Sequence, residues 1–350
     1  MDIHLNGIAT VVPPHVLPQD LVLTNARRIL GSRYAQFERM SGSFKASGVE
    51  TRYSFAPIEW FEEPRNWPER NAVYVEGGTA LFIEVAHKAL ASAGLKAADV
   101  DAIVTVSSTG IATPTLEARA ARELGFRNNV MRVPVFGLGC AGGVSGLAIA
   151  RDLAAARPGT NVLLIALEAC TLSFRSDRLQ KADIIATVLF GDGASAAIVS
   201  SERTGDGPTV TVGRGEQEMW PDTLNIMGWD VDEAGLGVIF DRSIPAFASE
   251  HFAGAARKAV SRMGVDLASF DRLVCHPGGA KVVEALEGAM ELEAGSLDAE
   301  RTILRDFGNM SAPTVLFVLQ RVLEKDAKGS MLACALGPGF TASFVPLEVS

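Results

Sequence analysis

Apolar stretches alternate with helical patterns along most of the chain. Strand-like apolar stretches occupy residues 102–106, 131–136, 162–167 and 273–275. Apolar residues at helical spacing occupy residues 144–156 and 314–323. This alternation predicts an α/β fold with a largely buried central sheet. Residues 56–71 carry three prolines and two tryptophans, and this composition predicts a surface loop.

Two pairs of segments resemble each other in the same order. Residues 86–104 (AHKALASAGLKAADVDAIV) align without gaps on residues 256–274 (ARKAVSRMGVDLASFDRLV). Farther on, residues 189–199 (LFGDGASAAIV) resemble residues 336–345 (LGPGFTASFV). We therefore expect two copies of one α/β unit, with the halves at residues 1–205 and 206–350.

Composition and charge narrow the class of protein. The chain has 350 residues, of which 48% are hydrophobic and 21% charged, as in a large globular protein. Its net charge of −9 and the lack of a block rich in Lys and Arg argue against nucleic-acid binding. An anionic ligand would therefore need a local basic patch or a helix N-terminus.

Targeting and redox features favour a cytoplasmic protein. The N-terminal MDIHLNGIAT does not resemble a signal peptide, and no apolar run reaches the roughly 18 residues of a membrane span. The four cysteines are widely spaced without a CxxC pair, which favours free thiols in a reducing compartment. The five histidines form no HxxxH or Cys/His cluster, so we expect no metal site.

One cysteine stands at a glycine-rich corner between a strand and a helix. Cys140 follows the strand-like residues 131–136, precedes the helical residues 144–156, and lies within the sequence GLGCAGG. The N-terminus of a helix favours a thiolate over a thiol. A glycine-flanked cysteine alone is weak support for catalysis, because most free cysteines are inert core residues.

Two further polar residues occupy similar corners in the second half. His276 ends the apolar strand 273–275 and precedes Pro277 and two glycines, and Asn309 precedes a helix predicted to start near Ser311. By itself Asn309 would be read as a helix N-cap. Corners at the carboxyl ends of strands converge on one crevice in such sheets. A nucleophile, a base and an amide donor that converge there predict a thiol acyl-transfer site.

The motifs around these residues resemble a known family. GCAGG at Cys140, LFGDGA at 189–194, HPGG at 276–279, GNMSAPTVLF at 308–317 and LGPGFT at 336–341 resemble the type III polyketide synthases, the chalcone-synthase-like branch of the thiolase superfamily. The resemblance implies a thiolase-like fold in which duplicated αβαβα halves form a five-layered αβαβα architecture. It also implies a homodimer and a triad of Cys140, His276 and Asn309.

The resemblance assigns further residues to the site. Phe190 matches the family's gatekeeping phenylalanine, and Thr113 matches the residue that reaches into the partner's cavity. The position of the second phenylalanine gate of the plant enzymes is taken by Val238, which leaves more room. Cavity-lining positions fall on Cys170, Ser173, Ala186, Ser311, Gly337, Pro338 and Gly339. Our candidates for binding CoA are Arg52, Lys281, Gly278 and Gly279.

The resemblance also implies a reaction cycle without a cofactor, in which CoA thioesters are the substrates. We expect a His276 imidazolium to keep the Cys140 thiolate ionised for attack on an acyl-CoA starter. We expect His276 and Asn309 to stabilise the enolate formed when malonyl-CoA loses CO2. Residues 168–194 and 227–245 resemble those of the bacterial alkylpyrone and alkylresorcinol synthases, and the small side chains of Ala186 and Val238 are compatible with a cavity that admits a long acyl chain. We therefore expect a fatty acyl starter and two or three malonyl-CoA extenders, closing to an alkylpyrone or alkylresorcinol.

Several alternatives stay open from the sequence. Cys170 also fits a 1,3,6,8-tetrahydroxynaphthalene synthase that uses malonyl-CoA alone. A ketoacyl synthase of fatty-acid initiation shares the triad but carries an HQAN-type segment where this chain has HPGG. A degradative thiolase needs an acid–base cysteine near the last glycine turn, and Cys334 is one residue out of register for it. A catalytically inactive protein with the same fold is the last alternative.

Overall fold

A mixed sheet runs through the computed structural model, which describes residues 1–31, 33–34, 36–177, 180–204, 207–325 and 327–350. In the first half, five neighbouring strands lie in the order β1 (His4–Val11), β7 (Asp192–Ser200), β6 (Asn161–Ala169), β4 (Ala102–Val106) and β5 (Met131–Val135). In the second half, the order is β12 (Arg272–Cys275), β13 (Gly329–Gly337), β14 (Thr341–Val349) and β8 (Val210–Val212), with β9 (Glu216–Met219) paired to β14. Strand β8 pairs with both β1 and β14 and so joins the halves.

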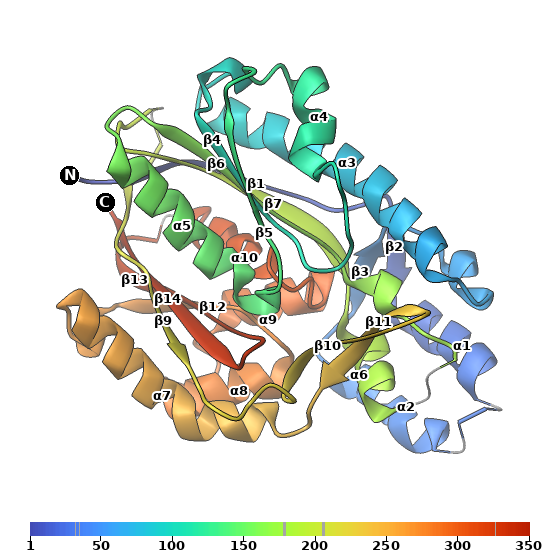
Figure 1. Cartoon of the computed structure of the whole chain (residues 1–350). Coiled ribbons are helices and arrows are strands. Elements are labelled where there is room, and N and C mark those ends of the chain that lie inside the picture. The colour runs from blue at the N-terminus through green and yellow to red at the C-terminus, as the bar shows by residue number, and fades with distance from the viewer. Residues whose placement is uncertain (32, 35, 178–179, 205–206, 326) are drawn as a thin grey trace.

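Helices separate and cover the two halves of the sheet. The middle layer holds α5 (Gly142–Ala156) and α10 (Thr314–Leu323), whose buried side chains pack with both halves of the sheet in one cluster, and α9 (Asp298–Phe307) joins it. The outer helices are α3 (Trp67–Ser92) and α4 (Leu116–Leu124) on one side, and α7 (Ile244–Met263) and α8 (Ala280–Ala289) on the other. Figure 1 shows this order, with α5 and α10 in the middle. The predicted five-layered αβαβα fold is confirmed.

Local sequence signals explain where the long helix α3 starts and what it buries. The Asn66 side chain accepts a hydrogen bond from the backbone of Glu69, whose carboxylate accepts one from the Asn66 backbone. This capping box and Pro68 start the helix at Trp67, inside the predicted surface loop. The short helix η1 (Ile58–Glu62) occupies another part of that predicted loop, and its Phe61 side chain is buried instead of lying at the surface. The prediction of a loop over residues 56–71 is therefore wrong in these two stretches.

The internal repeat has a clear structural counterpart. The 3₁₀ turns η2 (Ala97–Asp99) and η5 (Leu267–Ser269) lie at the offset of the aligned segments, and each leads into a strand, β4 or β12. Gly94 and Gly264 end the preceding helices with φ of 68° and 79°, a region that favours glycine. Each half therefore repeats the same helix–turn–strand unit. The predicted boundary, between residues 205 and 206, lies outside the described residues.

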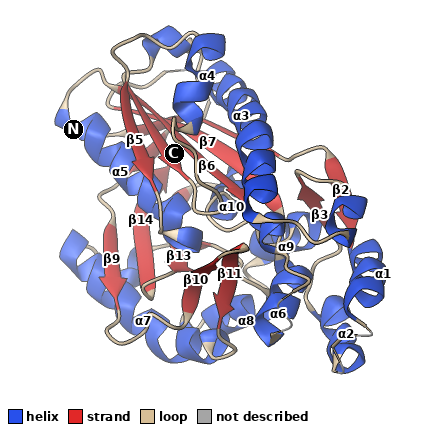
Figure 2. Ribbon diagram, turned by 45° about the vertical axis from the view of Figure 1, so that its right-hand side comes forward, coloured by secondary structure: helices blue, strands red, loops and turns tan. Residues whose placement is uncertain are grey.

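A smaller group of elements covers one end of the layered body. It comprises α1 (Gln19–Leu30), α2 (Phe37–Ala46), α6 (Lys181–Leu189), the hairpin of β2 (His15–Pro18) and β3 (Thr51–Ser54), and the hairpin of β10 (Met227–Asp232) and β11 (Gly235–Phe240). Figure 2 shows α1, α2 and α6 together on this side. The apolar faces of the three helices pack in one cluster of their own. This group contributes walls to the cavities described below.

Candidate active site

Cys140 lies where strand β5 turns into the middle layer. The residue belongs to the 3₁₀ turn η3 (Gly139–Ala141), which runs directly into the N-terminus of α5, and it is 6% exposed. Gly139 has φ of 47°, and a Cβ at Gly143 would lie 2.2 Å from the Ala312 carbonyl oxygen. The glycines therefore permit a tight turn that passes directly against the start of α10.

His276 lies at the end of strand β12, in the equivalent place of the second half. Its backbone N–H donates to the Cys334 carbonyl at 2.9 Å, and its own carbonyl accepts from the Gly278 N–H at 3.1 Å. The ring is 5% exposed, and neither ring nitrogen has a hydrogen-bond partner among the described residues. Because His276 also lines a cavity at Cys140, its ring is placed to bond a substrate there.

Asn309 is held by its backbone and by its side chain. The backbone N–H donates to the Leu189 carbonyl at 2.8 Å, which ties the residue to the end of α6. The side-chain oxygen accepts from the Ser311 N–H at 2.8 Å, and Nδ2 donates to the Gly278 carbonyl at 3.1 Å. These bonds orient the amide and leave one Nδ2 hydrogen for a ligand.

Two cavities meet at Cys140. The first, here called the triad recess, has a free volume of about 20 Å³ and is lined by Cys140, His276 and Asn309 together. The second, the central cavity, has a free volume of about 40 Å³ and is lined by Cys140, Cys170 and other residues. The structure therefore brings the three predicted catalytic side chains to one space, although they come from distant parts of the chain.

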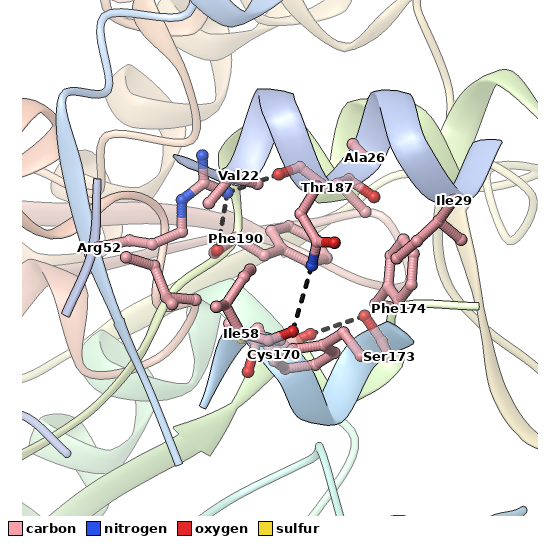
Figure 3. A pocket seen from close by; sticks show the side chains of 15 residues that line it. Val22, Ala26, Ile29, Arg52, Ile58, Cys170, Ser173, Phe174, Thr187 and Phe190 are labelled. Carbon is pink, nitrogen blue, oxygen red and sulfur yellow. Dashed lines mark hydrogen bonds between the residues drawn. The ribbon is translucent and has the colours of Figure 1, made fainter. Parts of the chain in front are cut away.

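An apolar pocket with a free volume of about 50 Å³ adjoins the central cavity. The two share Cys170 and Phe190 in their walls. Figure 3 shows Val22, Ala26 and Ile29 of α1 opposite Cys170 and other residues of the pocket wall. Cys170 and Phe190 therefore form the wall that the central cavity and this apolar space have in common.

A wide groove, here called the mouth, opens on the other side of the site. It has a free volume of about 500 Å³ and is lined by α2, α6, α8 and the end of β11. Its described lining includes four cationic side chains, Arg39, Lys181, Arg242 and Lys281, against the acidic Asp241. The mouth is thus a local basic patch on a chain of net charge −9.

Burial sets the protonation states of the nucleophile and the base. It raises the pKa of the Cys140 thiol to about 11, against the lowering effect of the Ser311 and Asn309 side chains. It lowers the pKa of His276 to about 3. The resting pair is therefore a thiol and a neutral imidazole near pH 7. The expected pair of thiolate and imidazolium is wrong for the resting protein, because two buried ions would lose their hydration.

Alkylation of Cys140 will report this neutral state. The rate of modification by iodoacetamide is expected to rise about tenfold per pH unit between about pH 7 and 9, because only the thiolate reacts. Mass spectrometry of the peptide that contains Cys140 measures the rate, and the Cys140→Ser variant identifies the signal. A rate that is constant over this range would show that Cys140 is already ionised.

Comparison with known proteins decides the family. The family of "chalcone and stilbene synthases" matches residues 4–203 with its N-terminal domain and residues 212–347 with its C-terminal domain. The chain belongs to this family of type III polyketide synthases. Membership separates it from the degradative thiolases and from the ketoacyl synthases of fatty-acid initiation.

Individual relatives cover nearly the whole of this type III polyketide synthase. A 1,3,6,8-tetrahydroxynaphthalene synthase of Streptomyces peucetius subsp. caesius is 37% identical, with 98% of this chain and 92% of that protein covered. The type III polyketide synthase A of Arabidopsis thaliana is 30% identical, with 96% and 90% covered. The crystal structure of the tetrahydroxynaphthalene synthase of Streptomyces coelicolor A3(2) has a TM-score of 0.92 at 29% identity, with 99% of each chain covered.

Most residues that the resemblance assigned to the cavity of the synthase line one of its spaces. The central cavity is lined by Cys170, Phe190, Val238, Ser311 and Pro338. The apolar pocket is lined by Cys170, Ser173, Ala186 and Phe190. Gly337 and Gly339 flank Pro338, and a Cβ at Gly337 would lie 2.6 Å from that of Ala141. Thr113 is exposed on the loop between β4 and α4. Lys281, Gly278 and Gly279 line the mouth.

Arg52 is not a CoA contact of the synthase, contrary to the prediction. Its side chain is 2% exposed, and its guanidinium donates to the carbonyls of Thr187, Val188 and Phe190 and to the Gln19 side chain. Arg52 therefore caps the last turn of α6 from inside. Burial lowers its pKa to about 9. Because the side chain is buried and both terminal nitrogens donate to protein oxygens, it cannot meet a phosphate at the surface.

Two aromatic residues of the central cavity were missed from the sequence. Phe240 follows Val238 by two residues on β11, and its ring lies edge-on to that of Phe190, with centroids 6.2 Å apart. Trp229 also lines the central cavity, where its indole N–H donates to the Ser108 carbonyl at 2.8 Å. The room expected beside Val238 is therefore bounded by aromatic rings. The period of two along a strand was the available signal for Phe240.

Glu168 was missed as well, and it supports the turn that carries the nucleophile. Its carboxyl accepts from the Ser108 N–H at 2.9 Å and from the Thr109 hydroxyl at 2.6 Å. The Ser108 hydroxyl in turn accepts from the Gly137 N–H at 3.0 Å, just before Cys140. Burial raises the pKa of Glu168 to about 8, so the carboxyl is largely protonated at pH 7. A lone acid within the apolar strand 162–170 was the signal in the sequence.

No three His, Cys, Asp or Glu side chains in the described part of the chain form a group that could hold a metal ion. None of the described helices is both long enough and apolar enough to cross a membrane.

Proposed function

We propose that this type III polyketide synthase extends a long-chain acyl group on Cys140 with malonyl-CoA and releases an alkylpyrone or alkylresorcinol. The apolar pocket carries this proposal. It adjoins the cavity of the nucleophile through Cys170 and Phe190, and its other walls are mainly apolar side chains of α1, η1, η4 (Cys170–Ser173) and α6. Each buried methylene contributes about 0.8 kcal/mol, so such a pocket favours a fatty acyl chain over an acetyl group.

In the loading step, the sulfur of Cys140 attacks the thioester carbonyl of the acyl-CoA. The thiol passes its proton to the neutral His276 as the new C–S bond forms, since neither group is charged at rest. The N-terminus of α5 stabilises the negative charge that develops on sulfur. His276 then gives the proton to the departing CoA thiolate, which leaves a neutral acyl-thioester on Cys140.

In the extension step, His276 and Asn309 act on malonyl-CoA. The free Nδ2 hydrogen of Asn309 and an N–H of His276 donate to the thioester oxygen, where negative charge develops as CO2 leaves. The resulting carbanion attacks the acyl group on Cys140, and the sulfur departs. An amide suits this place because a carboxylate would repel both the malonate and the enolate.

The mouth provides the site for the CoA part of both substrates. Its four cationic side chains fit the phosphates, and Gly278 and Gly279 allow a chain to pass close to the backbone. Lys281 lies directly after this glycine pair. A thioester that enters here reaches His276 and Asn309 by way of Phe240 and Gly278, which line both the mouth and the triad recess.

We also propose a homodimer in a reducing compartment such as the cytoplasm. Strand β5 lies at one edge of the sheet, and three large apolar side chains on and near it, Ile111, Met131 and Phe136, are each at least 55% exposed. A second copy would cover them and bring Thr113 toward the partner's cavity. All four cysteines are free thiols, which supports a reducing compartment.

A series of acyl-CoA starters of different length, given to the wild type and to one variant of α1, will test whether the apolar pocket holds the acyl chain. Ala26 is 3% exposed and lines the apolar pocket, so Ala26→Phe fills the pocket. We expect kcat/KM for dodecanoyl-CoA to fall at least about tenfold, with kcat/KM for acetyl-CoA little changed, because the loss scales with displaced methylenes. Mass spectrometry of products from malonyl-CoA with starters from acetyl-CoA to stearoyl-CoA measures both.

The Leu21→Phe variant serves as the matched control, because Leu21 lies on the exposed face of α1.

A second function, a 1,3,6,8-tetrahydroxynaphthalene synthase, is favoured by the Streptomyces peucetius relative and by Cys170 in the cavity wall. Product from malonyl-CoA alone, with no use of fatty acyl-CoA, would establish that function and remove the long-chain starter.

A further inference from the structure

Two cysteines that the proposed reaction does not use lie side by side in the second half of the sheet. Cys275 on β12 and Cys334 on β13 are directly paired residues of neighbouring parallel strands. Their sulfur atoms lie 3.1 Å apart, and the two residues are only 0% and 1% exposed. Both are free thiols. The sheet therefore holds a buried dithiol in addition to the nucleophile.

The geometry of the two strands suits a disulfide bond between these thiols. Neighbouring strands lie about 4.8 Å apart, and directly paired residues project their side chains from the same face of the sheet. A disulfide joins residues whose Cα atoms are about 4.4–6.8 Å apart, so this pairing falls within the permitted range. Closing the bond brings the two sulfur atoms from 3.1 Å to about 2.0 Å, which requires a movement of about 1 Å at the strand ends.

The dithiol is directly connected to the catalytic base. His276 follows Cys275 in the chain, and its backbone N–H donates to the Cys334 carbonyl at 2.9 Å. Cys334 also lines the triad recess, where the three catalytic side chains meet. A movement of the strand ends therefore displaces the His276 ring relative to Asn309. A misplacement of about 1 Å can lower a rate by about 10²-fold, so the oxidised pair should impair catalysis.

We propose that Cys275 and Cys334 form a reversible disulfide that inactivates the synthase when hydrogen peroxide accumulates. The bond itself does not depend on the proposed function, but its effect on activity rests on the role proposed for His276. In a reducing compartment the two thiols are the resting form, and the enzyme is active. The contact with Cys334 and burial raise the pKa of Cys275, so the thiol stays protonated and reacts slowly. The switch therefore responds to sustained exposure to the oxidant.

The oxidation balances with hydrogen peroxide as a two-electron oxidant. The oxidant must be small, since the free volume of the recess beside Cys334 is about 20 Å³. The sulfur of Cys334 attacks one peroxide oxygen, the O–O bond breaks, and the thiol proton leaves with the other oxygen as water. The sulfur of Cys275 then attacks the resulting sulfenic acid. The S–S bond forms, the S–O bond breaks, and the hydroxyl group leaves as water with the proton of Cys275.

Peptide mass spectrometry tests whether the bond forms. Trypsin releases Cys275 in the peptide 273–281 and Cys334 in the peptide 329–350, and neither peptide contains another cysteine. The wild type and the Cys140→Ala protein are treated with peroxide, blocked with iodoacetamide and digested without a reductant. We expect the two peptides to be linked, and dithiothreitol to separate them by thiol–disulfide exchange. The absence of linked peptide from both treated proteins would overturn the inference.

Release of labelled CO2 from malonyl-CoA measures the effect on the site. The Cys140→Ala protein serves here, because it lacks the nucleophilic thiol and its decarboxylation depends on His276 and Asn309. We expect peroxide to lower its rate at least about tenfold, and dithiothreitol to restore it. A linked protein whose rate stays within about twofold of the untreated rate would refute the switch. No release before treatment would reject the proposed role of the two donors, and product formation by the wild type and by Cys275→Ala then measures the switch.

The Cys275→Ala substitution, made in the wild type and in Cys140→Ala, provides the matched control. It removes one thiol of the pair and should keep the untreated rate, and peroxide should change that rate less than about twofold. An equal loss with and without Cys275 would also refute the switch, because the loss would then arise at another site. Circular dichroism establishes that each variant is folded. If Cys275→Ala does not fold, Cys334→Ala removes the same bond and takes its place.

Discussion

Replacing Cys140 with alanine will abolish acyl loading and condensation. The sulfur is the atom to which the acyl group is attached, and no other cysteine lines the triad recess together with the central cavity among the described residues. Product formation should fall by more than about 10³-fold, as it does when a nucleophile that works as a unit with its base is removed. Mass spectrometry of the intact protein after incubation with dodecanoyl-CoA should show no acyl adduct.

The same variant separates two parts of the mechanism. Release of CO2 from labelled malonyl-CoA should persist, because it depends on His276 and Asn309 rather than on the thiol. The matched control is Cys275→Ala, which removes a buried thiol that lies 3.1 Å from the sulfur of Cys334. This control should still acquire an acyl group. An adduct on the Cys140→Ala protein would contradict the assignment of the nucleophile.

The Asn309→Asp variant is expected to lose decarboxylation by about 10²–10³-fold. The substitution keeps an oxygen to accept from the Ser311 N–H but exchanges the Nδ2 donor for a second oxygen. That oxygen faces the Gly278 carbonyl and the developing enolate, and both repel it. If the new acid ionises, its charge also opposes the carboxylate of malonyl-CoA. Labelled CO2 released from malonyl-CoA measures the effect.

Acyl loading provides the internal comparison for this variant. The rate at which the dodecanoyl group is transferred from CoA to Cys140 should fall much less than the rate of decarboxylation, because no enolate forms in the transfer step. The control Asn128→Asp makes the same exchange at an exposed residue and should leave both steps unchanged. An Asn309→Asp protein that decarboxylates malonyl-CoA at the rate of wild type would remove Asn309 from the donors to the enolate.

Local patterns in the sequence determined much of the fold. The apolar spacing of residues 314–323 predicted the extent of α10, although the corner after Asn309 had suggested a start near Ser311, and residues 102–106 predicted β4. The aligned segments predicted a repeat, because the same helix, glycine turn and strand recur with the same spacing. The glycines around Cys140 indicated a close approach, since few other residues tolerate one. These features depend on neighbours in the chain and can therefore be read from it.

Tertiary structure alone decided how the site is lined and charged. Arg52 looked like a surface cation in the sequence, and only packing against the last turn of α6 buries it. Phe240 meets Phe190 across a cavity built from segments far apart in the chain. The neutral state of Cys140 and His276 follows from the loss of water around them. Desolvation and cavity shape depend on many residues that are far apart in the sequence and meet only in the folded protein. They therefore cannot be predicted from the order of residues along the chain.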